Sequence, residues 1–132
     1  IIGFDAGLAA WRRLVRRGGY LVVTEASWFR QDPPDELATF WNDAYPGMRS
    51  VEANAAAAEA AGWEIVSTFP LPESAWTEGY YVPLSARLGD FRRRHAHDED
   101  ALAVASMTER EIALYEAYAD YFGYAFYVLR NV

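Results

Sequence analysis

Two carboxylates, Glu25 and Glu73, are the side chains that the sequence best places to accept a proton in catalysis. Each stands near the expected end of a strand, where a glutamate acts either as a general base or as a plain hydrogen-bond acceptor. His95 and His97 lie two residues apart, a spacing that can chelate a metal. The acidic residues that follow them are more typical of a solvated helix boundary, so we expect no metal site.

No self-sufficient catalytic motif accompanies these residues. The sequence holds no G-x-G-x-x-G, no G-x-x-x-x-G-K-[ST] and no G-x-S-x-G. Ser27 and Ser74 have no histidine nearby in the sequence that would activate them as nucleophiles. The catalytic residues are therefore left open.

Aromatic side chains gather in the expected loops and helix ends rather than in the strands. They are Trp28, Phe29, Trp41, Trp76, Tyr80 and Tyr81. One interpretation is that they wrap the core under long connections. The other is an apolar lid over a small ligand or over a cationic methyl group, which aromatic faces attract.

The composition excludes several classes of protein. The chain of 132 residues has no Cys, which excludes disulfides, thiolate metal sites and cysteine nucleophiles. All 12 basic residues are Arg, which excludes a Schiff-base lysine, and the net charge of −7 argues against a nucleic-acid clamp. No apolar run is long enough to cross a membrane, and no signal peptide is visible. We expect a cytoplasmic protein, and a chain that begins with Ile1 rather than Met is compatible with a piece of a longer one.

The elements that must position these residues alternate between helix and strand. Apolar residues at spacings of three and four predict a helix over 4–17, which Gly18 and Gly19 end. Tyr20–Thr24 is a continuous apolar run, typical of a strand buried on both faces of a parallel sheet. The pattern continues with helices over 34–44 and 51–61, a strand over 63–69, an aromatic loop over 72–83, a helix over 83–95 interrupted at Gly89, a short helix near 98, a capped helix over 108–122 and a last strand over 124–130.

This order resembles the C-terminal half of a class I S-adenosylmethionine-dependent methyltransferase of the small bacterial type. Leu14–Leu21 is similar to that family's L-(L/K)-x-P-G-G-x-(L/V) stretch, with Arg17 in place of the proline. Ala60–Trp63 is similar to the A-G-F that precedes its sixth strand. Glu25 with Trp28 is similar to an S-E-x-x-W after the fifth strand, and 75–84 to an A-W-x-x-x-Y-Y-x-P-L after the sixth.

The resemblance implies an α/β fold: one domain over 1–132 that is the C-terminal half of a Rossmann-like methyltransferase fold. It implies a three-stranded mixed sheet with covering helices, in the order fifth, seventh, sixth strand, the last strand being antiparallel and lying between the other two. The family's cofactor-binding half, with its glycine-rich turn and ribose-binding acid, would be absent. This chain would then supply sheet completion and a cover over the acceptor.

The implied chemistry is methyl transfer from S-adenosylmethionine to a small-molecule acceptor, which depends on holding two reactants aligned and dry. In that interpretation Gly3 and Phe4 lie near the cofactor's edge. The residues expected on the acceptor side are Glu25, Trp28, Trp76, Tyr80 and Tyr81.

Two other interpretations stay open at this point. The chain is either a non-catalytic α/β binding or assembly module, or a fragment of another Rossmann-type enzyme such as a dehydrogenase. We expect neither nucleic acid nor membrane as a partner. Because Tyr20–Thr24 would lack its neighbouring strand, we also expect a homodimer across that exposed edge if the chain exists alone.

Overall fold

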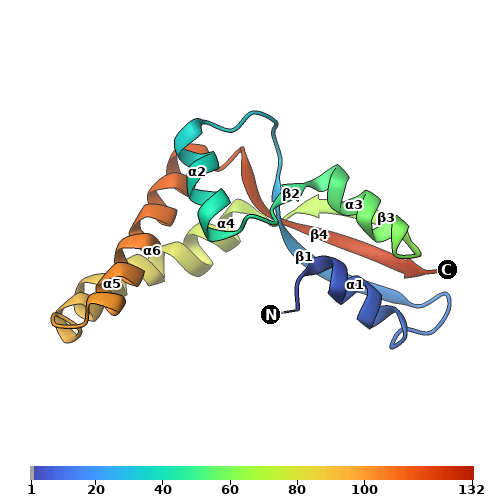
Figure 1. Cartoon of the computed structure of the whole chain (residues 1–132), viewed down its shortest axis with the longest axis horizontal. Helices are drawn as coiled ribbons and strands as arrows, with labels where there is room; N and C mark the ends of the chain where they lie inside the picture. The colour runs from blue at the N-terminus through green and yellow to red at the C-terminus, as the bar shows by residue number, and fades with distance from the viewer. Residues whose placement is uncertain (1) are drawn as a thin grey trace. The chain divides into compact units, whose positions relative to one another are not determined.

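The computed structural model describes residues 2–132, which fall into two compact units. The first unit contains the residues up to Leu71 together with Asp120–Val132, and the second contains Pro72–Ala119. Figure 1 shows the sheet in the first unit and only helices in the second. Each unit is described by itself.

A four-stranded mixed sheet forms the first unit. Its strands are β1 (Tyr20–Trp28), β2 (Arg49–Ser50), β3 (Trp63–Pro70) and β4 (Phe122–Asn131), in the order β2-β1-β4-β3. β4 is antiparallel to both β1 and β3 and lies between them, which confirms the expected strand order. The expected number of three strands is wrong, because β2 pairs in parallel with Ser27 and Trp28 at the end of β1. A strand of two residues carries no periodicity that a sequence could reveal.

Helices cover one face of this sheet. α1 (Phe4–Arg12) and α3 (Val51–Ala60) run along the strands, and α2 (Asp35–Ala44) lies farther from the centre of the sheet (Figure 1). The shared core contains Phe4, Leu8, Ala58, Trp63, Ala125, Tyr127 and Leu129. β1 is therefore not buried on both faces as expected. Tyr20 and Val22 are 60% and 57% exposed, while Leu21 and Val23, whose side chains point to the other face, pack on the core.

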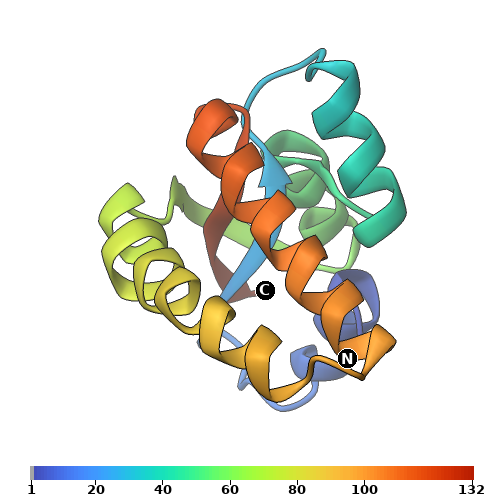
Figure 2. The same cartoon turned by 90° about the vertical axis from the view of Figure 1, so that its left-hand side faces the viewer.

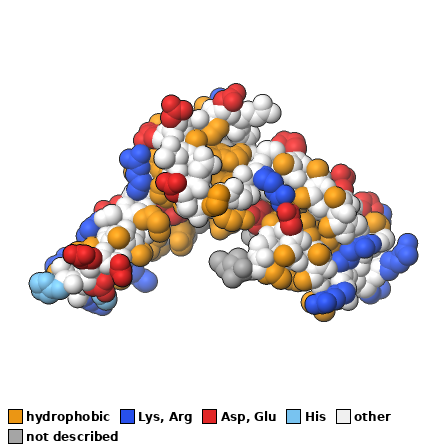
Figure 3. Space-filling view, in the orientation of Figure 1, with side chains coloured by type: hydrophobic (Ala, Val, Ile, Leu, Met, Phe, Trp, Pro, Cys, Tyr) orange, Lys and Arg blue, Asp and Glu red, His pale blue; other side chains and the backbone are white. Residues whose placement is uncertain are grey.

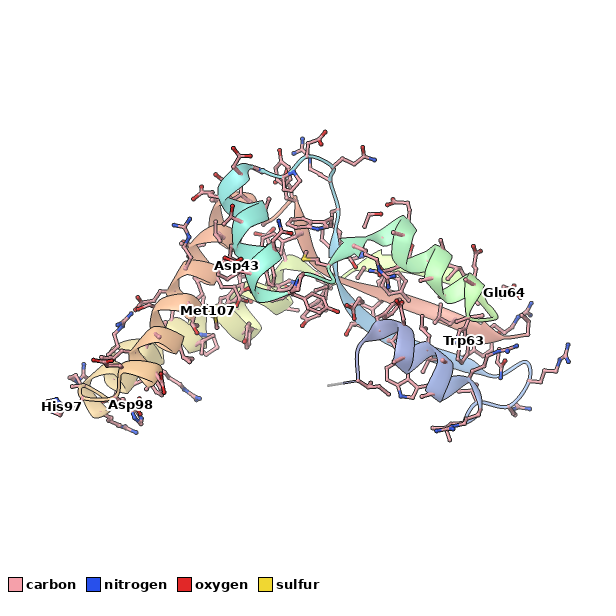
Figure 4. The ribbon with its side chains drawn as sticks, in the orientation of Figure 1. Asp43, Trp63, Glu64, His97, Asp98 and Met107 are labelled. Carbon is pink, nitrogen blue, oxygen red and sulfur yellow. The ribbon has the colours of Figure 1, made fainter. Side chains whose placement is uncertain are left out.

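The end of β4 fixes α1 in place. Asn131 donates from Nδ2 to the carbonyls of Arg12 and Val15, at 3.1 and 2.6 Å, and accepts from Arg12 Nε at 3.2 Å. α1 therefore ends at Arg12, five residues before the expected end, because a side chain from β4 takes carbonyls that a longer helix would have used. Figure 4 labels Trp63 beside α1, and its indole Nε1 donates to the carbonyl of Leu8 at 3.1 Å.

The second unit is helical throughout its regular structure. It contains α4 (Glu73–Trp76), the π-helical turn η1 (Thr77–Tyr81), α5 (Val82–Arg94) and α6 (Glu99–Tyr118). Figure 2 shows α5 and α6 as a helical hairpin. The aromatic segment is thus helical and not a loop, and α5 continues through Gly89 without a break. α6 begins after Asp98, whose side chain accepts from the Ala101 N–H, so the cap expected at Thr108 is wrong.

Candidate functional site

A hollow of about 510 Å³ opens in the first unit, beside the carboxyl end of β1. Two segments line it: residues 2–6 at the start of α1, and residues 45–47 after α2 together with Arg49, the first residue of β2. The backbone at Gly3 takes a positive φ of 82°, which lets the chain turn into α1 without a side chain in the way. The carboxyl ends of strands are where ligands bind in open α/β sheets, so this hollow is the candidate site.

The end of α2 positions a tyrosine at the hollow. Pro46 cannot continue the helix, and the N–H of Tyr45 closes the last turn on the carbonyl of Trp41 at 2.7 Å. The Tyr45 hydroxyl then donates to Glu25 Oε1 on β1. Tyr45 is the hydrogen-bond partner that the structure gives the Glu25 carboxylate among the described residues.

An ion pair between two lining residues also belongs to the hollow. Arg49 donates from both terminal nitrogens to Asp5, the shorter contact being 2.6 Å, and from Nε to Asn54 Oδ1 at 3.0 Å. Its guanidinium also lies 5.9 Å from the centre of the Phe4 ring. Three of its donors are thus engaged by protein acceptors.

A buried polar network supports Arg49 from behind. Asn54, 1% exposed, donates from Nδ2 to Ser27 Oγ and to the Tyr127 hydroxyl, both at 3.2 Å. Those two hydroxyls are 2.8 Å apart. Because the Asn54 amide nitrogen is held by the two hydroxyls, its oxygen is turned toward Arg49.

Burial and hydrogen bonding shift the acid–base properties of this group. Desolvation raises the pKa of Glu25, against the lowering effects of the Tyr45 hydrogen bond and the Arg49 charge. The hydrogen bond to Glu25, aided by burial, raises the pKa of Tyr45 to about 12. At neutral pH the Tyr45 hydroxyl is therefore protonated and donates its hydrogen bond to a Glu25 carboxylate that desolvation destabilises.

Three of the residues expected from the sequence meet at this site. Gly3 and Phe4 line the hollow, and Glu25 lies behind Tyr45. Trp28 belongs to the same unit, at the end of β1, where its ring meets Phe122 edge-on at 6.4 Å.

The other three expected residues lie in the second unit. Trp76 and Tyr81 stack at 5.4 Å and are 8% and 4% exposed, while Tyr80 is 50% exposed. The Tyr81 hydroxyl donates to Glu111 on α6 at 2.7 Å, and burial together with that bond raises the pKa of Tyr81. Trp76 and Tyr81 thus form part of this unit's own core, and their assignment to the acceptor side stays a prediction.

Sequence reasoning missed Tyr45, Arg49 and Asp5. Tyr45 precedes a helix-breaking Pro-Gly pair, which is the signal that places it at a helix end beside a turn. The Arg49–Asp5 pair joins residues 44 apart, and nothing in the sequence indicates such a pairing.

Charge elsewhere on the described surface is arranged differently. Figure 3 shows arginine side chains gathered around the end of α1 and the turn after it, the opposite end of α1 from the hollow. Figure 4 labels His97 and Asp98 at the turn between α5 and α6. Within residues 2–132 no group of three or more His, Asp or Glu side chains is arranged to hold a metal ion. No helix of residues 2–132 is long and apolar enough to span a membrane.

Comparison with solved structures defines the fold. The chain is similar to a SAM-dependent methyltransferase from Geobacter sulfurreducens, solved with S-adenosyl-L-homocysteine, at 18% identity and a TM-score of 0.72 over 97% of this chain and 52% of that one. It is also similar to YjhP from E. coli, at 17% identity and a TM-score of 0.75 over 98% of this chain and 54% of that one. A third similar structure is the [4+2]-cyclase SpnF, at 23% identity and a TM-score of 0.64 over 96% of this chain and 43% of that one.

The chain therefore has the fold of about half of a SAM-dependent methyltransferase structure, and spans about half the length of these proteins. No family model and no curated protein sequence matches it. At identities below 25% these similarities establish the fold, and the cyclase among them illustrates that one fold carries more than one chemistry.

Proposed function

We propose that this chain is the acceptor-side half of an S-adenosylmethionine-dependent methyltransferase that acts on a small molecule. The observation that carries the proposal is the match of 97% of the chain to 52% of a methyltransferase solved with S-adenosyl-L-homocysteine. The hollow beside the carboxyl end of β1 supports it, because it lies where ligands bind in sheets of this kind. The proposal also includes three expectations that rest on the sequence. Residues 1–132 belong to a single methyltransferase domain, the enzyme is of the bacterial type, and the protein is cytoplasmic.

The residues of this chain fit one edge of the cofactor. A Cβ on Gly3 would meet no atom within 4 Å, so a ligand can approach the backbone there, and Phe4 follows it in the lining of the hollow. When bound, S-adenosylmethionine supplies a methyl group on a sulfonium centre. Gly3 and Phe4 would hold its edge, and the sequence contains no glycine-rich turn that would enclose the rest.

The acceptor would lie on the Tyr45 side of the same hollow. Glu25 and Tyr45 would orient the acceptor through hydrogen bonds. The assignment of Trp28, Trp76, Tyr80 and Tyr81 to the acceptor side rests on the sequence resemblance alone. Such a site accelerates transfer mainly by holding the acceptor in line and dry. Asn54 would act indirectly, because it holds Arg49, a residue of the lining, in place.

Two measurements test this proposal. Calorimetric titration of the 132-residue chain with S-adenosylmethionine should give no measurable binding, because only one edge of the cofactor site is present. The protein read from the complete reading frame should bind the cofactor and form S-adenosylhomocysteine with a small-molecule acceptor, as followed by mass spectrometry. Micromolar binding of S-adenosylmethionine by the 132-residue chain alone would contradict the proposal that this chain contributes only one edge of the cofactor site. A complete protein that binds no cofactor would favour the alternative of a non-catalytic binding or assembly module.

A further inference from the structure

The side chains near the hollow include a hydrogen-bond acceptor at Tyr45 and carboxylates at Asp5 and Glu25. The hydroxyl proton of Tyr45 is used by Glu25, so what the Tyr45 oxygen can still offer a ligand is a lone pair. Arg49 directs Nε and both terminal nitrogens to Asn54 and Asp5. A ligand that contacts the Tyr45 oxygen must itself bring the N–H or O–H. The backbone N–H groups that begin α1 and the remaining N–H groups of Arg49 are donors elsewhere in the lining.

The charge at the hollow also favours a ligand that carries N–H donors and a positive charge. Glu25 and Asp5 carry two negative charges, and Arg49 carries one positive charge, so the group has a net charge of −1 with the carboxyls ionised. Tyr45 lines the hollow and is half-buried, whereas the Phe4 ring is 6% exposed and packs on Tyr127 in the core. Aromatic faces attract organic cations, and more strongly when water is excluded.

We propose that the hollow binds a protonated primary or secondary amine, with its N–H donating to the Tyr45 hydroxyl oxygen and Glu25 as the final proton acceptor. This inference rests on the proposed function in one respect: the amine would be the methyl acceptor. Its binding stands on the hollow alone.

The proton transfer balances within the site. The ammonium N–H bond breaks and its proton goes to the Tyr45 oxygen, while the Tyr45 O–H bond breaks and that proton goes to Glu25 Oε1. The amine nitrogen keeps the electron pair and becomes neutral, Glu25 becomes a carboxylic acid, and nothing is oxidised or reduced. The desolvation that raises the pKa of Glu25 makes it a better proton acceptor, and the pKa of about 12 at Tyr45 keeps that hydroxyl protonated between transfers. The neutral nitrogen is the nucleophile that a methyl transfer requires.

Three probes of equal shape and different charge test the binding. The ¹⁵N-labelled 132-residue chain is titrated at pH 7 with benzylamine, benzoate and benzyl alcohol, and the amide resonances of Gly3 and Gly47 report on the hollow. We expect protonated benzylamine to shift both resonances at concentrations about tenfold below those that benzoate or benzyl alcohol requires, as for a charge-assisted hydrogen bond.

Matched variants separate the two acceptors from general effects. Tyr45→Phe and Glu25→Gln keep the shape of each side chain and should each weaken benzylamine binding about tenfold. Their controls are Tyr20→Phe, 60% exposed at the start of β1, and Glu59→Gln, at an exposed position on α3, which should leave binding unchanged. The ¹⁵N spectra also show whether each variant keeps the native fold.

Three results would overturn the proposed amine binding. Benzoate binding as tightly as benzylamine would assign the hollow to Arg49 and an anion, and would overturn the inference. So would the absence of any shift at Gly3 and Gly47, or unchanged binding in a folded Tyr45→Phe variant. Because no cofactor is present, these results are separate from the methyl-transfer test: a complete protein that binds amines but forms no S-adenosylhomocysteine would contradict only the proposed function.

Discussion

The Glu25 carboxylate is held in a place that favours its neutral form. Desolvation is the largest influence and outweighs both the hydrogen bond from Tyr45 and the charge of Arg49. A residue kept for structure alone would gain from being uncharged here. A carboxylate whose surroundings favour its neutral form is therefore the feature at residue scale that suggests chemistry.

The raised pKa of Glu25 predicts how the stability of the folded chain depends on pH. Because the pKa of Glu25 is raised on folding from its usual 4.5, the protonated form favours the folded state below about pH 4.5, and this contribution is lost as the pH rises through the raised pKa. Glu25→Gln should therefore increase the denaturation midpoint at pH 7, and the gain should vanish as the pH falls below 4.5. Denaturant melts of both proteins across this range give the comparison. Glu59→Gln is the control, and a difference that grows toward acidic pH would refute the assignment.

At the scale of elements, the aromatic cluster of α4, η1 and α6 forms the core of the second unit. Trp76 lies 5.4 Å from the ring of Tyr81 and 5.3 Å from that of Tyr115. The sequence resemblance implies that Trp76 and Tyr81 lie on the acceptor side. Their burial indicates that they also hold the unit together.

Truncation of Trp76 should therefore cost stability. Trp76→Ala removes a ring that is 8% exposed and should destabilise the second unit by about 3–5 kcal/mol, as large-to-small changes in cores do. Tyr80→Ala, at a position 50% exposed, should cost far less. Hydrogen exchange, measured separately for residues of α6 and of β4, would localise the loss. Equal protection of α6 in Trp76→Ala and in the unchanged chain would show that the ring is not structural.

The sequence predicted the elements better than their contacts. The long periodic segments, such as α2 and α3, begin and end within a residue or two of their expected positions, and the resemblance supplied the strand order. The sequence-based prediction failed where tertiary contacts determine the local structure. Asn131 ends α1 early, and β2 is too short to carry a pattern. At the site, Glu25, Gly3 and Phe4 were predicted, but their partners Tyr45 and Arg49 come from segments that only folding brings together.

At the scale of the whole molecule, the sheet leaves one edge of β1 largely unpaired. Among the described residues β1 pairs with β4 along its length, whereas on its other side β2 meets only Ser27 and Trp28. The stretch from Tyr20 to Ala26 thus presents free backbone groups on that side. Exposed apolar side chains, Tyr20 and Val22, stand on the strand beside them.

Such an edge should drive self-association of the chain when it exists alone. Unpaired strands template pairing with another chain, and burying apolar surface stabilises by about 25 cal/mol per Å², so a few hundred Å² suffices. Light scattering at micromolar concentration should give a mass well above the 14.9 kDa of one chain. Val22→Lys, which places a charge on the edge strand, should shift the mass toward the monomer, whereas Val104→Lys on α6, at a position of similar exposure, should not. A monodisperse monomer of the unchanged chain, or equal effects of both lysines, would mean that this edge is not the association surface.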